Sequence, residues 1–170
     1  MHRKHAIALA LVGIWIGWTL FMWFAATRSF RTASRVFQKP GPQFEQVLRP
    51  LSGSSALTVL RHFAGEVNAT YFRAYGLAQI VLGVIIVLLL SWQTPRDAAG
   101  LALAGVMLAL VLILALWIAP QIASLGRSLD FSPSSAQASH FWMLHGAYTG
   151  LDSVKLLAGI VLAVRWIWMV

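Results

Sequence analysis

Four long runs of apolar residues dominate the pattern along the chain, at about residues 6–26, 74–92, 98–119 and 151–168. Each run is about 20 residues long, which is the length an α-helix needs to cross the roughly 30 Å hydrocarbon layer of a bilayer. The third run carries no charged residue. The pattern therefore predicts four membrane-spanning helices and no soluble domain.

The residues between the runs predict where these helices begin and end. Thr94-Pro95 is typical of an N-cap followed by the first helical residue, and Ser132-Pro133 repeats the pattern before the fourth run. The prolines and glycine of 39–42 end the first helix near Gln38. The stretch 55–92 has no proline. The second and fourth helices are therefore expected to continue well beyond the bilayer.

Helices 1 and 3 leave the bilayer on the side where helices 2 and 4 enter it, so all extensions share one side. We expect an all-α integral membrane protein, a four-helix transmembrane bundle with helices 2 and 4 extended beyond the bilayer on one side. It forms a single domain over residues 1–170, closed on the opposite side by a tight turn at Gln93–Thr94. The long basic segment 27–73 is expected to hold helix extensions and a short amphipathic piece at 43–48.

Composition agrees with a membrane protein. Hydrophobic residues make up 59% of the chain and charged residues 11%, against about a quarter charged in an ordinary soluble domain. Thirteen basic residues outnumber five acidic ones. Because cytoplasmic loops of membrane proteins collect Lys and Arg, this excess needs no nucleic-acid partner. The chain has no cysteine, which excludes disulfides, thiolate metal sites and iron–sulfur clusters.

The distribution of basic residues predicts the orientation. Eight lie on the side of the extensions, namely Arg28, Arg31, Arg35, Lys39, Arg49, Arg61, Arg73 and Arg127. Four lie on the other side, namely Arg3, Lys4, Arg96 and Arg165. The excess predicts that the extensions are cytoplasmic and both termini are outside, although Arg3 and Lys4 favour the reverse.

A basic stripe follows the first apolar run. It consists of Arg28, Arg31, Arg35 and Lys39, which share one face of a helix at i, i+3, i+7 and i+11. One interpretation is contact with the anionic headgroups of the bilayer. The other is a docking surface for an acidic partner protein.

The fourth helix carries a polar stripe inside an apolar run. His145, Thr149 and Asp152 lie at i, i+4 and i+7, with Lys155 close to them. Ionisable groups at membrane depth usually face the bundle interior and have a partner. Candidate partners lie on the second helix, and they are His62, Glu66, Thr70 and Arg73, with Tyr75 and Gln79 deeper.

Depth along the helices suggests which of these stripes meet. Arg73 precedes Trp92 by 19 residues, and Thr149 precedes Trp168 by the same number. We therefore expect Arg73 to pair with Asp152, with Lys155 as the alternative. The layer is either structural, or a solute, ion or proton site, or a haem or metal site that uses His62, Glu66 and His145. We assign no catalytic, cofactor or metal residue.

Two glycine pairs, Gly13 with Gly17 and Gly146 with Gly150, each place small residues four apart on one helical face. Such pairs allow two helix backbones to approach closely in lipid. They predict helix packing within the bundle, or homodimerisation through the first helix.

Short motifs in the second and fourth helices resemble those of a known family. They are Phe141-x-x-Leu-His145, Arg61-His-Phe-Ala-Gly65 and Tyr71-Phe-Arg-Ala-Tyr75. The chain resembles uncharacterised four-span bacterial membrane proteins, a domain of unknown function related to eukaryotic transmembrane protein two-hundred-and-five. His145 matches a family histidine, whereas Asp152 stands near an asparagine of some members. The resemblance implies a protein of the bacterial cytoplasmic (inner) membrane and supplies no reaction.

These observations favour a membrane protein that is not an enzyme. We expect a small scaffold or accessory subunit, which forms a homo-oligomer or binds a partner membrane protein. The first alternative is a transporter of small solutes or metal ions that uses the layer of His145, Asp152 and Arg73. The second is a haem-carrying redox protein that uses His62 and His145.

Overall fold

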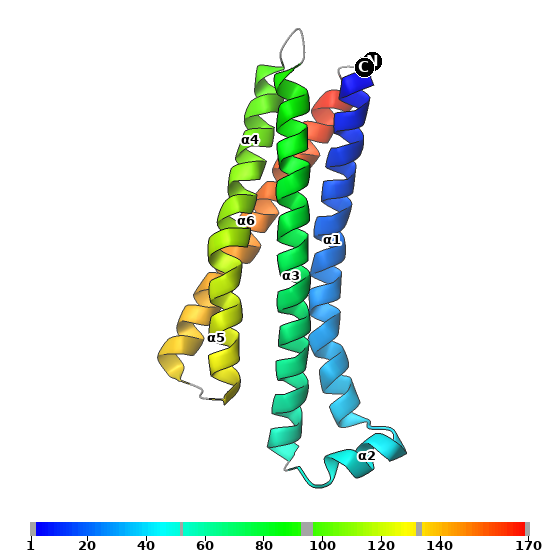
Figure 1. Cartoon of the computed structure of the whole chain (residues 1–170), viewed down its shortest axis with the longest axis vertical. Helices are drawn as coiled ribbons and strands as arrows, with labels where there is room; N and C mark the ends of the chain where they lie inside the picture. The colour runs from blue at the N-terminus through cyan, green and yellow to red at the C-terminus, as the bar shows by residue number, and fades with distance from the viewer. Residues whose placement is uncertain (1–2, 52, 93–96, 132–133, 169–170) are drawn as a thin grey trace.

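The computed structural model describes residues 3–51, 53–92, 97–131 and 134–168, and these are helical almost throughout (Figure 1). The elements are α1 (Arg3–Gln38), α2 (Pro42–Leu48), α3 (Gly53–Ser91), α4 (Ala98–Ile113), the π-helical turn η1 (Leu114–Ile118), α5 (Ala119–Phe131) and α6 (Ser135–Trp168). They form four long rods, because α4, η1 and α5 are continuous. All four rods are long and apolar enough to cross a membrane, which confirms the predicted all-α four-helix bundle.

Each rod packs against two neighbours. α1 and α4 both contact α3 and α6, and α5 continues the contacts of α4 with the same two helices. Buried positions recur at alternating spacings of three and four, as along α6 at Tyr148, Asp152, Lys155, Gly159, Leu162 and Trp166. This spacing is typical of bundles whose helices cross at about 20°.

The two ends of the bundle differ. At one end α1 begins, α3 ends, α4 begins and α6 ends; we call this the terminal end (Figure 1). The opposite end carries α2 and α5, and we call it the extension end. α3 has 39 residues and α6 has 34, against the roughly 20 that a bilayer requires. The predicted extension of these two helices is therefore confirmed, as are the end of α1 at Gln38 and the short helix near 43–48.

The third rod also extends, which the predicted span 98–119 did not include. In η1 the N–H of Ala119 bonds to the carbonyl of Leu114, five residues back. Pro120 follows directly and has no N–H to donate. A proline ring normally clashes with the carbonyl four residues back, and the wider π turn relieves that clash. The rod therefore continues as α5 to Phe131.

The start of α4 differs from the prediction. Its N-cap is Asp97, whose Oδ1 accepts the N–H of Gly100 at 3.0 Å, so the capping residue is not Thr94. Asp97 caps well because its short carboxylate reaches the free N–H groups of the first turn. Thr94-Pro95 and the turn at Gln93–Thr94 lie outside the described residues.

α6 begins with a serine N-cap, as predicted, but the capping residue is Ser134. The hydroxyl of Ser134 accepts the N–H of Gln137 at 3.2 Å, which is the bond expected of an N-cap serine. The predicted Ser132-Pro133 lies outside the described residues.

The glycines predicted to pack do not pack within this chain. Gly13, Gly17, Gly146 and Gly150 are exposed, and a Cβ added at any of them would meet no atom within 4 Å. The prediction of packing inside the bundle is wrong because all four face outward. Contact with a second copy through α1 stays a prediction.

Different glycines bring the rods together. A Cβ on Gly76 of α3 would lie 2.7 Å from the Cβ of Ala115 in η1, and one on Gly159 of α6 would lie 3.1 Å from Met107 Cε. In lipid the hydrophobic effect does not hold helices together, so close van der Waals packing of helix backbones at small residues stabilises the bundle instead. The π turn therefore packs directly against α3.

Candidate functional site

Lys155 lies at the centre of a buried polar group between α1, α3 and α6. Its side chain has 0% relative exposure, and that of Asp152 has 1%. The ammonium Nζ donates to Asp152 Oδ1 at 2.5 Å, to Gln79 Oε1 at 2.6 Å and to the Tyr75 hydroxyl at 3.0 Å. A lysine ammonium has three N–H donors, so all three are used.

The partners of Lys155 are bonded in turn. Asp152 Oδ2 accepts the indole N–H of Trp23 at 2.6 Å. The Thr19 hydroxyl accepts from the Tyr75 hydroxyl at 3.0 Å and from Gln79 Nε2 at 3.1 Å, and it donates to the Trp15 carbonyl at 3.0 Å. We call the six side chains the Lys155 network: Thr19, Trp23, Tyr75, Gln79, Asp152 and Lys155.

The hydrogen bonds of the network stabilise a buried ion pair, Lys155–Asp152, whose desolvation costs free energy. An unpaired charge in a dry interior costs several kcal/mol, and a buried pair is tolerated only when further hydrogen bonds complete it. Lys155 and Asp152 lie on the same helix, so the ion pair alone joins no helices. The hydrogen bonds to Tyr75 and Gln79 of α3 and from Trp23 of α1 tie α6 to these two helices.

An apolar core separates the network from the terminal end. It contains Ala8, Val12, Trp15, Ile86, Leu90, Ala104, Met107, Val111, Leu162 and Trp166. Lys155 precedes Trp168 by 13 residues, or about 20 Å of helix. Since protein cores are close-packed and have few voids larger than a water molecule, this apolar core closes the bundle on that side of the network.

Only part of the predicted polar layer lies in the interior of the bundle. Asp152 and Lys155 face the interior, whereas His145, Thr149 and Arg73 are exposed. The predicted Arg73–Asp152 pair is wrong, because Asp152 bonds to Lys155 and Trp23 instead.

Rotation around the helix axis accounts for the misplaced residues. Arg73 lies two residues before the buried Tyr75, and two residues turn an α-helix by about 200°. On α6, Thr149 lies about 100° and His145 about 60° around the helix axis from Tyr148, so neither is on the buried line of Tyr148, Asp152 and Lys155. The layer of His145, Asp152 and Arg73 predicted for a transporter is therefore not assembled.

His62 and Glu66 belong to a separate contact at the extension end, between α3 and α5. His62 Nδ1 lies 2.9 Å from Asp130 Oδ2, and Glu66 Oε1 accepts from Arg127 Nε at 2.5 Å. His145 is instead exposed and stacks on the ring of Phe141. The two histidines considered for haem thus do not face each other, and no group of three metal-binding side chains occurs in the described part of the chain.

Thr19 and Trp23 were not predicted to belong to the network. Thr19 is the only polar residue apart from the tryptophans in 6–26, and an isolated hydroxyl in a membrane span is a signal for an interhelical hydrogen bond. Trp23 lies near the end of the first apolar run, where a tryptophan is usually an interface anchor, although its indole N–H also requires a partner when it is buried.

A second polar contact lies at the terminal end, around Asp97. Beyond capping α4, its carboxylate accepts from Trp166 Nε1 at 2.9 Å and Arg165 Nη2 at 3.0 Å. Burial raises the pKa of this carboxyl, but the bonds from Gly100, Trp166 and Arg165 outweigh that effect and hold the pKa below its usual value. The carboxylate thus stays charged and ties α4 to α6.

The fold and the site together define a multi-pass membrane protein, a four-helix bundle organised around a buried Lys–Asp network. Comparisons of the chain with protein-family models, with curated proteins and with solved structures found no significant match.

Proposed function

We propose that the protein is a small, non-enzymatic membrane scaffold or accessory subunit, and that the Lys155 network serves to hold its helices in register. The observation that carries the proposal is the completeness of the network. All three donors of Lys155 and both oxygens of Asp152 are bonded to other side chains of the bundle. A solute or ion site would instead need a group left open to a ligand.

The apolar core at the terminal end supports the same proposal. A conducting path would have to continue from the network through about 20 Å of helix that is packed with Val12, Ile86, Leu90 and their neighbours. Polar groups for relaying a proton or an ion are what such a path needs. Rigid packing at this place suits a protein that presents a fixed surface to a partner or to a second copy.

The proposed role predicts that the protein does not translocate protons. Purified protein in liposomes with a trapped pH-sensitive dye should dissipate a pH gradient no faster than protein-free liposomes, with an added protonophore showing that the dye responds. The variant Asp152→Asn should behave in the same way. Proton flux above background that Asp152→Asn abolishes would contradict the scaffold role and make the network a proton site.

We further propose that the protein lies in a bacterial cytoplasmic membrane with its extension end in the cytoplasm. The family resemblance of the His145 motif supports the membrane, and the excess of basic residues at the extension end supports the orientation.

This orientation predicts which positions react with membrane-impermeant thiol reagents in intact cells. Single cysteines at Ser54 and Ser134, both exposed at the extension end, should stay unlabelled until the cells are opened. The chain has no cysteine of its own, so the background is low. Labelling of both positions in intact cells would reverse the orientation.

A further inference from the structure

The basic stripe on α1 receives no side-chain counter-charge from within the chain. The chain has five acidic residues, and all five lie in the described ranges. Each is paired with a basic group elsewhere, as Glu45–Arg49, Glu66–Arg127, Asp97–Arg165, Asp130–His62 and Asp152–Lys155. No side-chain carboxylate is therefore left to neutralise Arg31 or Arg35.

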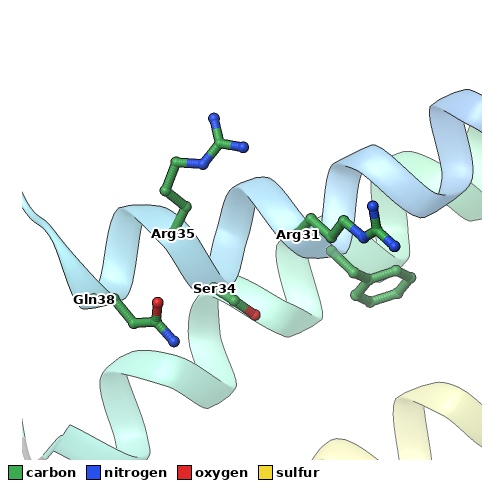
Figure 2. Close-up of a pocket in the computed structure, with 5 residues that line it drawn as sticks. Arg31, Ser34, Arg35 and Gln38 are labelled. Atoms are coloured by element: carbon green, nitrogen blue, oxygen red, sulfur yellow. The ribbon is translucent and has the colours of Figure 1, made fainter.

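The same part of α1 forms an open hollow of about 390 Å³. It is lined by Arg31, Arg35, Ser34, Gln38 and the half-exposed ring of Phe30. Figure 2 shows the two arginines one turn apart on α1; Ser34 and Gln38 lie below the ribbon in this view, and Arg35 extends above it. Guanidinium, hydroxyl and amide groups are all donors to phosphate oxygens, and the ring adds an apolar wall.

The hollow begins at the outer edge of the headgroup layer. Arg31 and Arg35 follow the apolar run 6–26 by 5 and 9 residues, or about 8 and 14 Å of helix. Each headgroup layer is about 5–8 Å thick. Side chains on a helix lean toward its N-terminus, and α1 runs out of the bilayer, so both arginines lean back toward the lipid surface.

The other helix that leaves the bilayer at this end provides a contrast. α5 carries Arg127, which Glu66 of α3 neutralises with two hydrogen bonds. Neither Arg31 nor Arg35 has a carboxylate partner of this kind. The chain thus neutralises Arg127 internally, whereas no carboxylate of the chain neutralises Arg31 or Arg35.

From the unpaired charges, the hollow and its depth, we infer that Arg31, Ser34, Arg35 and Gln38 form a binding site for the phosphodiester headgroup of an anionic phospholipid. The inference is independent of the proposed scaffold role, since it concerns the outer surface of α1 and not the Lys155 network.

The test is native mass spectrometry of the whole protein from a nonionic detergent, with phosphatidylglycerol and phosphatidylcholine added at equal concentration. The wild type should retain phosphatidylglycerol preferentially. Arg31→Gln with Arg35→Gln should weaken phosphatidylglycerol binding about 20- to 30-fold, which corresponds to about 1 kcal/mol per basic residue at a membrane surface. Phosphatidylcholine binding should not change.

The matched control is Arg49→Gln with Arg61→Gln. It removes the same two charges from exposed positions at the same end of the molecule, but from the end of α2 and from α3 rather than from the hollow. This variant should keep the lipid preference of the wild type. A loss equal to that of the Arg31 and Arg35 variant would mean that only net charge matters, and it would overturn the site.

Two other outcomes would also overturn the inference. Equal retention of the two lipids by the wild type would leave an acidic protein as the occupant of the stripe. Displacement of phosphatidylglycerol by millimolar sodium phosphate, but not by sodium chloride at the same ionic strength, would assign the hollow to free phosphate. Unchanged thermal unfolding of both double variants checks that all comparisons are made on folded protein.

Discussion

Replacing Lys155 with methionine is expected to lower the free energy of unfolding by about 3–5 kcal/mol. The substitution keeps the length of the side chain but removes the cation, so the carboxylate of Asp152 stays buried with 1% exposure and only Trp23 as its partner. It also leaves Gln79 Oε1 without its donor. Reversible unfolding in detergent micelles, followed by circular dichroism, measures the change.

The double variant Lys155→Met with Asp152→Leu separates the cost of an unpaired charge from the value of the pair. Because apolar residues of similar volume often replace a buried ion pair at little cost, the double variant should recover most of the stability lost in Lys155→Met. Lys39→Met, at an exposed position that follows α1, should leave stability unchanged. A double variant as unstable as Lys155→Met would show that the carboxylate is not what makes the single change costly.

Gly76→Leu is expected to give the second largest effect, a loss of about 3 kcal/mol, at the upper end of overpacking changes. Even a methyl group at this position would lie 2.7 Å from the Cβ of Ala115. Ala115 has no flexible side chain that can move away, so the leucine has to displace the backbone of η1 from α3. Thermal unfolding in detergent is again the measurement.

Gly13→Leu is the matched control for this substitution. Gly13 also lies within a membrane-spanning helix, but its Cβ would meet no atom within 4 Å. Leucine is a better helix former than glycine, so stability should be unchanged or slightly higher. Equal losses for Gly13→Leu and Gly76→Leu would mean that the close approach of α3 and η1 does not limit what fits there.

The sequence predicts where the helices are far better than which way they face. Hydropathy located all four rods, because an uncharged apolar run of about 20 residues is rare outside membrane spans. Rotation is harder to predict, since lipid is as apolar as a protein core and both faces of a membrane helix carry Leu, Val and Ile. Gly13 and Gly17 were therefore assigned to packing, although they face outward.

The sequence predicted only part of the buried polar site, because the rotation of each helix about its axis is hard to predict. Asp152 and Lys155 were expected to face the interior, since charged groups at that depth need partners. Arg73 was assigned to the inner face of α3, although it is exposed. Trp23 could not be found from its residue type, because a tryptophan near a span end is usually an interface anchor.

The Lys155 network has a consequence for how the chain enters the membrane during synthesis. The most apolar 18-residue stretch of α6 has a mean hydropathy of 1.5, against 2.0, 2.3 and 2.9 for the three rods before it. Lys and Asp at the centre of a helix each oppose its transfer into the bilayer by about 2.5–3.5 kcal/mol. By the time α6 leaves the ribosome, however, Thr19, Trp23, Tyr75 and Gln79 have already been made. α6 can therefore insert against α1 and α3, which already carry these partners. The order of synthesis thus supplies the hydrogen-bonding groups in the bilayer before the charged residues Asp152 and Lys155 have to enter it.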